Sequence, residues 1–273
     1  IALGYTMVYG IAKMLNFAHG DVIMVGGYIS FCAMFYLGLP NIVAVLLAVI
    51  VCTVLGVVIE RLAYKPLRSA PSLAVLITAI GVSYFLQNSA LLIWKAAARS
   101  YPPVVTGAVK IFGGKLTVSY VSLLTIAACV VIMIGLTTFV NKSKMGKAMR
   151  ATAQNRKMAM LLGIDTDRII SLTFIIGSSL AAIGGVLIAN HVGQVNFFIG
   201  FIAGIKAFTA AVLGGIGSIP GAMVGGLVLG LCESFATGYI SSAYEDALAF
   251  ALLVLILIFR PAGILGKPKV QKV

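Results

Sequence analysis

The sequence predicts an all-helical integral membrane protein with about nine transmembrane helices. Of its 273 residues, 61% are hydrophobic and 10% are charged, whereas about a quarter of the residues in an average soluble domain are charged. The mean hydropathy of +1.10 agrees with this imbalance. No segment alternates apolar and polar residues as a membrane strand does, so helices are expected to satisfy the backbone in lipid. The composition therefore argues against a soluble enzyme.

The expected spans follow one another along nearly the whole chain. Only twelve largely apolar residues precede Lys13, fewer than the roughly 20 that a crossing helix needs, so we expect the first span to lack its N-terminal part. Stretches of 19 or more residues without Asp, Glu, Lys or Arg occur at 41–59, 72–94, 116–140 and 169–190. Three further spans carry one charged residue each: 20–37 with Asp21, 201–217 with Lys206, and 221–240 with Glu233. The last apolar run, 247–259, is only 13 residues long and needs a tilt or a thinner bilayer.

Basic residues predict the orientation of these spans. Alternate loops divide the 20 Lys and Arg residues into fifteen on one side and four on the other, with Lys206 inside a span. The basic side is expected to be cytoplasmic and to include the C-terminus. The net charge of +13 then reflects topology and an anionic lipid surface rather than a nucleic acid partner. We expect residues 1–273 to form one transmembrane domain with an inner loop at 141–168 and an outer loop at 95–115.

The inner loop contains a predicted short helix. Residues 147–162 lack Pro and Gly and stop at Gly163, a good C-terminal cap. Asp165 or Thr166 can cap the next span, with Asp167 in its first turn. The short helix either lies on anionic lipid or docks a soluble partner through apolar contacts at Met149, Met158, Ala159 and Leu162.

Polar residues and glycine are concentrated at 16–21, which we expect at the inner end of the first complete span. One interpretation is a broken helix whose irregular backbone lines a translocation pathway, with candidate residues Asn16, Phe17, His19, Gly20 and Asp21. The other is that Asn16 caps the helix and Asp21 stabilises its first turn. One His and one Asp are too few ligands for a metal site, and His191 falls on the opposite side.

Two charges lie inside spans and need partners or water. Lys206 is thirteen residues before Ile219, the centre of a predicted hairpin, and Glu233 is fourteen after it. The two side chains should lie at similar depth, as a structural ion pair or as polar lining of the pathway. The Gly-rich spans are expected to pack closely, notably at the small-xxx-small spacings Gly221–Gly225 and Gly226–Gly230.

Three motifs resemble one known family. The segments are LGYTMVYG (3–10) with NFAHGDVIMVGGY (16–28), RATAQNRKMAMLLGI (150–164), and AFTAAVLGGIGSIPGAMVGG (207–226). In this order they resemble the high-affinity branched-chain amino acid permeases of bacterial ABC importers, specifically the H-type subunit. The resemblance implies an inner-membrane permease that moves branched-chain or related neutral amino acids into the cell. Permeases for urea, amides or other small polar solutes, and a passive channel, are alternatives.

The resemblance also implies partners and a coupling surface. In such importers a short helix between spans inserts into a groove of the ATPase subunit. The corresponding residues here are Met149, Arg150, Gln154, Asn155, Met158, Ala159, Leu162 and Gly163. The chain has no GxxxxGK[ST] pattern, so ATP and Mg²⁺ are expected on two separate ATPase subunits. A second, related permease chain and a soluble or lipid-tethered binding protein complete the expected assembly, and no cofactor or catalytic residue is expected in this chain.

The outer loop is a candidate docking surface for the binding protein. It is longer than a connection between helices needs, and its prolines, Pro102 and Pro103, stiffen it. It contains no acidic residue, and its basic residues can steer an acidic patch on a partner or contact lipid phosphates. These residues are Lys95, Arg99, Lys110 and Lys115.

Overall fold

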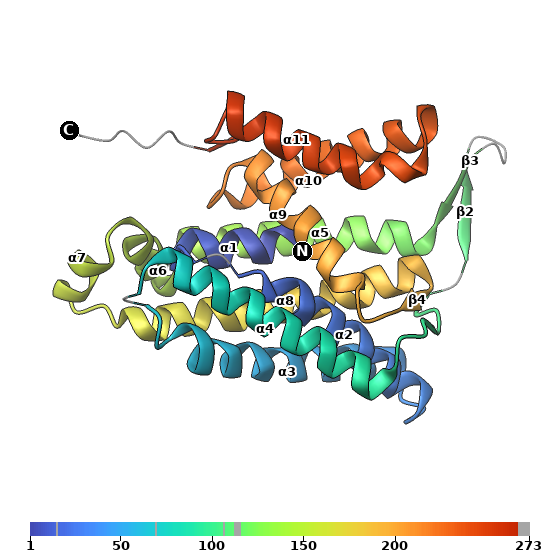
Figure 1. Ribbon diagram of the computed structural model, residues 1–273, viewed down its shortest axis with the longest axis horizontal. Coiled ribbons are helices and arrows are strands. Elements are labelled where there is room, and N and C mark those ends of the chain that lie inside the picture. Colours follow the sequence, from blue (N-terminus) through green and yellow to red (C-terminus); the bar gives the residue numbers. More distant parts are fainter. Residues whose placement is uncertain (15, 69, 106, 112–115, 267–273) are drawn as a thin grey trace.

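The computed structural model describes residues 1–14, 16–68, 70–105, 107–111 and 116–266, and most of them are helical (Figure 1). The helices of the first half are α1 (Ala2–Ala12), α2 (Ala18–Phe35), α3 (Asn41–Ile59), a π-helical turn (Glu60–Tyr64), α4 (Ser72–Trp94) and α5 (Tyr120–Lys142). Those of the second half are α6 (Lys144–Gln154), α7 (Arg156–Leu161), α8 (Thr166–Val192), α9 (Ile199–Gly214), α10 (Ile219–Tyr239), a 3₁₀ turn (Ser242–Tyr244) and α11 (Glu245–Phe259).

The long helices run side by side along the long axis of the molecule. Among the described residues, seven helices are long and apolar enough to cross a membrane, while α1 and α9 are apolar but shorter. The predicted all-α class is therefore confirmed, whereas the predicted count of nine crossings is not. In Figure 1, α6, α7 and the C-terminal end of α11 lie at one end of the bundle, and the strands lie at the other. The basic loops of the predicted inner side thus meet at one end.

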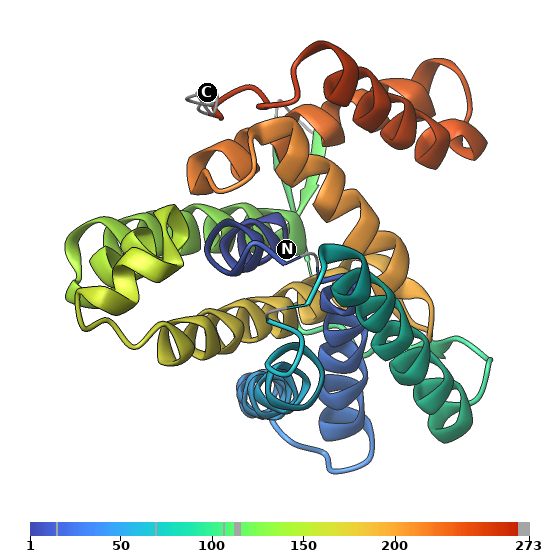
Figure 2. The same cartoon turned by 60° about the vertical axis from the view of Figure 1, so that its left-hand side comes forward.

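Helix α8 forms the centre of the bundle, with α1, α2 and α3 packed against it. The contacts use small side chains and glycines, so the backbones approach closely, as is common between membrane helices. Tyr28, Phe174 and Met24 are fully buried in the core around these helices. By contrast, α5 and α11 bury few of their residues, namely Val121, Leu136 and Ala249, and Figure 2 shows α11 at the edge of the molecule beyond α9 and α10. These exposed apolar surfaces suit contact with lipid.

Four short strands were not predicted. Strand β1 (Arg99–Ser100) pairs with β4 (Gln194–Val195), and β2 (Ala108–Ile111) pairs with β3 (Leu116–Ser119), both antiparallel. The span predicted to start at residue 116 therefore starts later, at Tyr120. Ser119 ends the strand and caps the helix, because its hydroxyl accepts a hydrogen bond from the backbone N–H of Val121 at 3.2 Å.

The inner loop also differs from its prediction, since it forms two helices instead of one. Asn155 has an extended backbone (φ −152°, ψ 106°), and its side chain accepts a hydrogen bond from the backbone N–H of Met158 at 3.1 Å. It therefore ends α6 and caps α7. The predicted stop at Gly163 is confirmed: its φ is 79°, and the N–H of Ile164 donates to the carbonyl of Ala159, as in a Schellman motif. Asp165 caps α8, as predicted.

Candidate functional site

The interruption between α1 and α2 lies at about half the depth of the bundle. Helix α1 ends at Ala12, Lys13 has a left-handed backbone (φ 55°), and α2 starts only at residue 18. The His19 side chain lies beside Gly4 and Gly177, and Gly177 is near the middle of α8. Asp21 contacts Gln87, which is also well inside α4. The expectation that this segment lies at the inner end of a span is therefore wrong, because α1 runs inward and the chain returns to half depth before α2 begins.

The N-terminus of α2 has no side-chain cap. The expectation that Asn16 caps it is wrong, because the side-chain amide oxygen of Asn16 (Oδ1) accepts a hydrogen bond from the Tyr64 hydroxyl at 2.8 Å. Phe17 occupies the capping position, and its ring instead packs against Phe208 of α9. The helix is thus broken, and the electropositive start of α2 lies inside the bundle without a side-chain cap.

His19 is buried beside the aromatic ring of Tyr5. Its ring is 1% exposed and meets Tyr5 edge-on with the centroids 5.8 Å apart. Tyr5 in turn lies 5.5 Å from Phe208. Among the described residues, neither His19 Nε2 nor the Tyr5 hydroxyl has a hydrogen-bond partner. A buried polar atom without a partner carries a desolvation cost, so this region can accept a polar group or water.

Asp21 faces α4 rather than α1. Its Oδ1 accepts a hydrogen bond from Gln87 Nε2 at 3.0 Å, and the same amide nitrogen lies 3.1 Å from Ser83 Oγ. Asp21 is fully buried, and its Oδ2 has no partner among the described residues. The sequence analysis missed Gln87 and Ser83, although two polar residues four positions apart in an apolar span were a usable signal.

Gly20 allows α2 to touch α9. A Cβ atom at Gly20 would lie 2.5 Å from the carbonyl oxygen of Gly200 and 3.2 Å from the Cα of Gly204. Only a glycine permits this approach, since both neighbours are backbone atoms. The predicted packing role of glycine is confirmed here and at Gly225, whose Cβ would meet α9. It is not found at Gly226 or Gly230, which have open space around the Cα atom.

The predicted ion pair between α9 and α10 is present. Lys206 Nζ lies 3.3 Å from Glu233 Oε1, and it also contacts Glu245 at 2.5 Å and Asp246 at 3.0 Å. The two acids of α11 were missed because the predicted span began only after them. One ammonium group thus joins three helices. No group of three or more His, Cys, Asp or Glu side chains in the described part of the chain is arranged to hold a metal ion.

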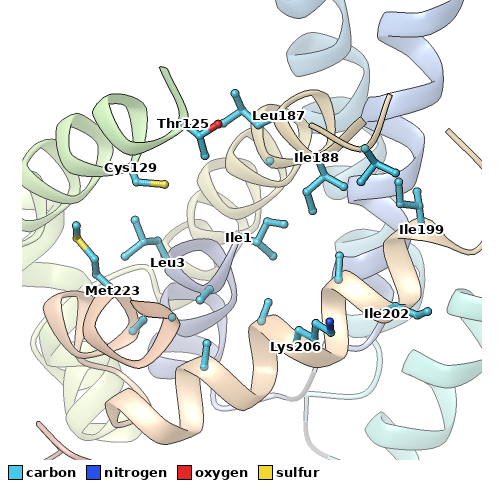
Figure 3. A pocket seen from close by; sticks show the side chains of 18 of the residues that line it. Ile1, Leu3, Thr125, Cys129, Leu187, Ile188, Ile199, Ile202, Lys206 and Met223 are labelled. Carbon is cyan, nitrogen blue, oxygen red and sulfur yellow. The ribbon is translucent and has the colours of Figure 1, made fainter. Parts of the chain in front are cut away.

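Lys206 also lines a cavity of about 690 Å³ between α5, α8, α9 and α10 (Figure 3). The walls are mainly aliphatic, and Ile1 and Leu3 of the N-terminal end project into it. Within the described ranges, Lys206 is the only charged residue of the lining, and none of residues 16–21 contributes to it. Residues 16–21 therefore lie outside this cavity, although Gly204 and Phe208, two positions on either side of Lys206, contact Gly20 and Phe17.

The exposed apolar surface of the inner loop differs from the predicted one. Met149 and Ala159 are 0% and 1% exposed, because they pack inside the chain, so they are not free to contact a partner. Arg150 donates hydrogen bonds to the side chain and carbonyl of Asn141, while Gln154, Asn155 and Gly163 are exposed. The apolar side chains that α7 and its C-terminal end leave exposed are Met158, Met160, Leu161 and Leu162, of which Leu161 is 80% exposed.

The outer loop is held firmly over its first part. The Tyr101 hydroxyl is 2.8 Å from Ser30 Oγ, and Val104 bonds to the side chains of Asn41 and Asn190. Burial raises the pKa of Tyr101 above its ordinary value.

The four predicted docking residues of this loop differ in their surroundings. Lys95 and Lys110 are exposed. Arg99 is half-buried and donates to the carbonyl of Trp94 at 3.4 Å. Lys115 lies outside the described residues. The exposed positive charge of the loop is thus carried by Lys95 and Lys110 among the predicted residues that the structure describes.

Comparison with known proteins finds relatives that are described as branched-chain amino acid transport permeases. The family model described as "Branched-chain amino acid transport system / permease component" matches residues 1–257. The chain is 49% identical over 285 residues to the high-affinity branched-chain amino acid transport system permease protein BraD of Pseudomonas aeruginosa, covering 100% of this chain and 92% of BraD. It is 47% identical over 291 residues to LivH of Escherichia coli (strain K12), with the same coverage. A probable LivH of Methanocaldococcus jannaschii is 27% identical over 97% of this chain and 87% of its own length. No solved structure matches.

Proposed function

Because the chain belongs to the family of branched-chain amino acid transport permeases, we propose that it is the membrane-spanning subunit of an ATP-driven importer that brings branched-chain or related neutral amino acids into the cell. The family assignment agrees with the resemblance drawn from the three sequence motifs. The basic loops indicate insertion in the bacterial inner membrane with the C-terminus in the cytoplasm. No enzymatic activity of its own is proposed for this chain.

The exposed apolar side chains of α7 carry the assignment of an energised importer. Met158, Met160, Leu161 and Leu162 are exposed and lie outside the spanning helices at the basic end of the bundle. A cluster of exposed apolar side chains on a short, well-capped helix is typical of a protein contact. We assign this surface, in place of Met149 and Ala159, to a groove of an ATPase subunit. ATP and Mg²⁺ then bind to two such subunits and not to this chain.

The interruption between α1 and α2 is the proposed solute contact in the membrane. Discontinuous helices in transporters place helix N-termini and unpaired polar groups at half depth, where they meet polar parts of the solute. Here the start of α2 and the unpartnered atoms of His19, Tyr5 and Asp21 offer both kinds of group. The helix start and His19 suit a carboxylate, and the Asp21 carboxylate suits an ammonium group.

The rest of the assembly follows the family pattern. A second, related permease chain is expected to pack beside this one, and the open glycine position Gly230 on α10 permits close approach of another helix. A periplasmic or lipid-tethered binding protein is expected at the outer end, near Lys95 and Lys110. Most selectivity between solutes is expected to reside in that protein.

The test uses the chain co-expressed with the ATPase subunits of its own importer and purified in mild detergent. We expect Leu161→Asp to abolish co-purification of the ATPase subunits, because a carboxylate buried in an apolar groove costs several kcal/mol. Leu161→Met keeps the apolar surface and should retain the subunits. Since Leu161 is 80% exposed, both variants should elute as the wild-type permease does when expressed alone. Equal ATPase recovery in both variants, or solute uptake without ATP, would indicate a passive channel or a different docking surface.

A further inference from the structure

A series of ionic contacts joins α7 to the spanning helices at the inner end of the bundle. Arg156, the first residue of α7, lies 3.0 Å from Asp167 of α8. The same Asp167 oxygen binds Arg68, and the other guanidinium nitrogen of Arg68 binds Glu60. The Arg156 Nε also donates to the Thr166 hydroxyl at 3.4 Å. The contacts therefore connect the proposed docking helix with α8, with the segment before α4, and with the end of α3.

Burial makes the Arg68–Glu60 contact of this series rigid. Glu60 is 0% exposed and the Arg68 side chain is 6% exposed. Glu60 also accepts a hydrogen bond from Ser171 at 2.9 Å, so both of its oxygens have partners. Arg68 Nε has no partner among the described residues, but the pair resists separation, because each buried charge left alone would be strongly destabilised. The exposed pair Arg168–Asp165, at 86% and 51% exposure, lacks this property.

The series of contacts continues from Glu60 to the α1–α2 interruption. Glu60 begins the π-helical turn and Tyr64 ends it. The Tyr64 hydroxyl donates to Asn16 at 2.8 Å, and its ring packs against Phe174 of α8. Single π-helical turns are frequent at functional positions, where they loosen the regular helix. A displacement of Glu60 therefore reaches Asn16 through one short, non-α-helical turn.

Space for such a displacement exists beside the two arginines. A cavity of about 330 Å³ is lined by Arg68 and Arg156 together with Lys13, Thr152 and Ile170. Packed interiors transmit movement and seldom deform, whereas side chains at a cavity can exchange partners. Arg68 and Arg156 share one carboxylate, that of Asp167, so a shift of α7 alters the position of both.

We propose that Arg156, Asp167, Arg68 and Glu60 are positioning residues that link movement of α7 to the α1–α2 interruption. This inference rests on the proposed function, in which an ATPase subunit moves α7. The link lets closure of the nucleotide site change the environment of Asn16 and the start of α2. Its members touch neither ATP nor solute.

The test uses the complete importer in proteoliposomes and measures ATP hydrolysed per solute taken up. We expect Arg156→Gln and Tyr64→Phe each to raise this ratio, by about 2- to 30-fold for coupling residues of this kind. The matched control, Arg168→Gln, removes a neighbouring arginine whose ion pair is exposed, and it should leave the ratio unchanged. ATPase co-purification should remain intact in all three variants.

A variant that carries both Arg156→Gln and Tyr64→Phe distinguishes one shared link from two independent local effects. Arg156 and Tyr64 share no contact, so independent effects on the ratio would multiply. If both act through one link, Arg156→Gln with Tyr64→Phe should equal the stronger single variant. Multiplicative effects, an unchanged ratio in either single variant, or loss of the ATPase from Arg156→Gln alone would overturn the inference. Failure of the proposed function would give a different result. In that case the wild-type permease would not co-purify with the ATPase through α7.

Discussion

Replacing Gly20 by alanine tests whether the close contact of α2 with α9 positions the interrupted helix. The added Cβ atom would lie 2.5 Å from the Gly200 carbonyl oxygen, whereas ordinary contacts begin near 3.4 Å. The two helices must therefore separate by about 1 Å, because a backbone oxygen cannot rotate away. Overpacking of this kind costs about 1–3 kcal/mol.

The matched control is Gly226→Ala on α10, where no atom lies within 4 Å of the added Cβ. The same substitution there gains helix propensity, up to about 1 kcal/mol. Because both glycines lie in helices, the gain in propensity is common to both variants, and they should differ by the overpacking cost of about 1–3 kcal/mol, equivalent to about 2–12 °C in the unfolding midpoint of a chain of this size.

Thermal unfolding of the purified protein in detergent, followed by size exclusion, measures this difference. Uptake should also fall in Gly20→Ala, since the start of α2 shifts by about 1 Å relative to its neighbours. If Gly20→Ala is as stable and active as Gly226→Ala, the packing argument is wrong and α2 is free to move away from α9.

Three further changes probe other parts of the molecule. Lys206→Met should cost about 1–3 kcal/mol, because it leaves the Glu233 carboxylate without its ammonium partner in a partly exposed site; adding Glu233→Gln should recover part of the loss, and a single variant as stable as wild type would contradict the role of the pair. Tyr101→Phe should cost about 1 kcal/mol and speed hydrogen exchange in the outer loop. Because burial raises the pKa of the Tyr101 phenol, the contribution of its neutral form is fully present below about pH 10 and is lost as the pH rises through the raised pKa; a protection factor, taken relative to the intrinsic exchange rate at each pH, that already falls near neutral pH would refute this. Changing Lys95 and Lys110 to Gln should slow association of the binding protein at low salt and flatten its salt dependence, and an unchanged salt slope would exclude steering by these charges.

Local features of the sequence determined much of the architecture. Apolar runs identified the spanning helices, counts of Lys and Arg separated the two ends, and the cap at Asp165 with the stop at Gly163 delimited the inner segment correctly. Each of these signals depends on residues within a few positions of one another, or on composition summed over a loop. The nearly equal sequence offsets of Lys206 and Glu233 from the hairpin likewise sufficed to predict their ion pair, because two helices joined by a short turn must run antiparallel.

The tertiary structure alone decided which side chains are available and which are joined. Gly221–Gly225 and Gly226–Gly230 share one spacing, yet Gly221 and Gly225 meet α9 and the other two face open space. Met149, Ala159 and Leu162 are apolar residues of the same inner loop. Met149 and Ala159 are buried because α6 and α7 fold back onto the rest of the protein, whereas Leu162 is exposed. The contact of Arg68 with Asp167 joins positions 99 residues apart. Such pairings depend on how the helices rotate and cross, and the free energy that sets those angles comes from packing among several helices, which no local pattern in the sequence records.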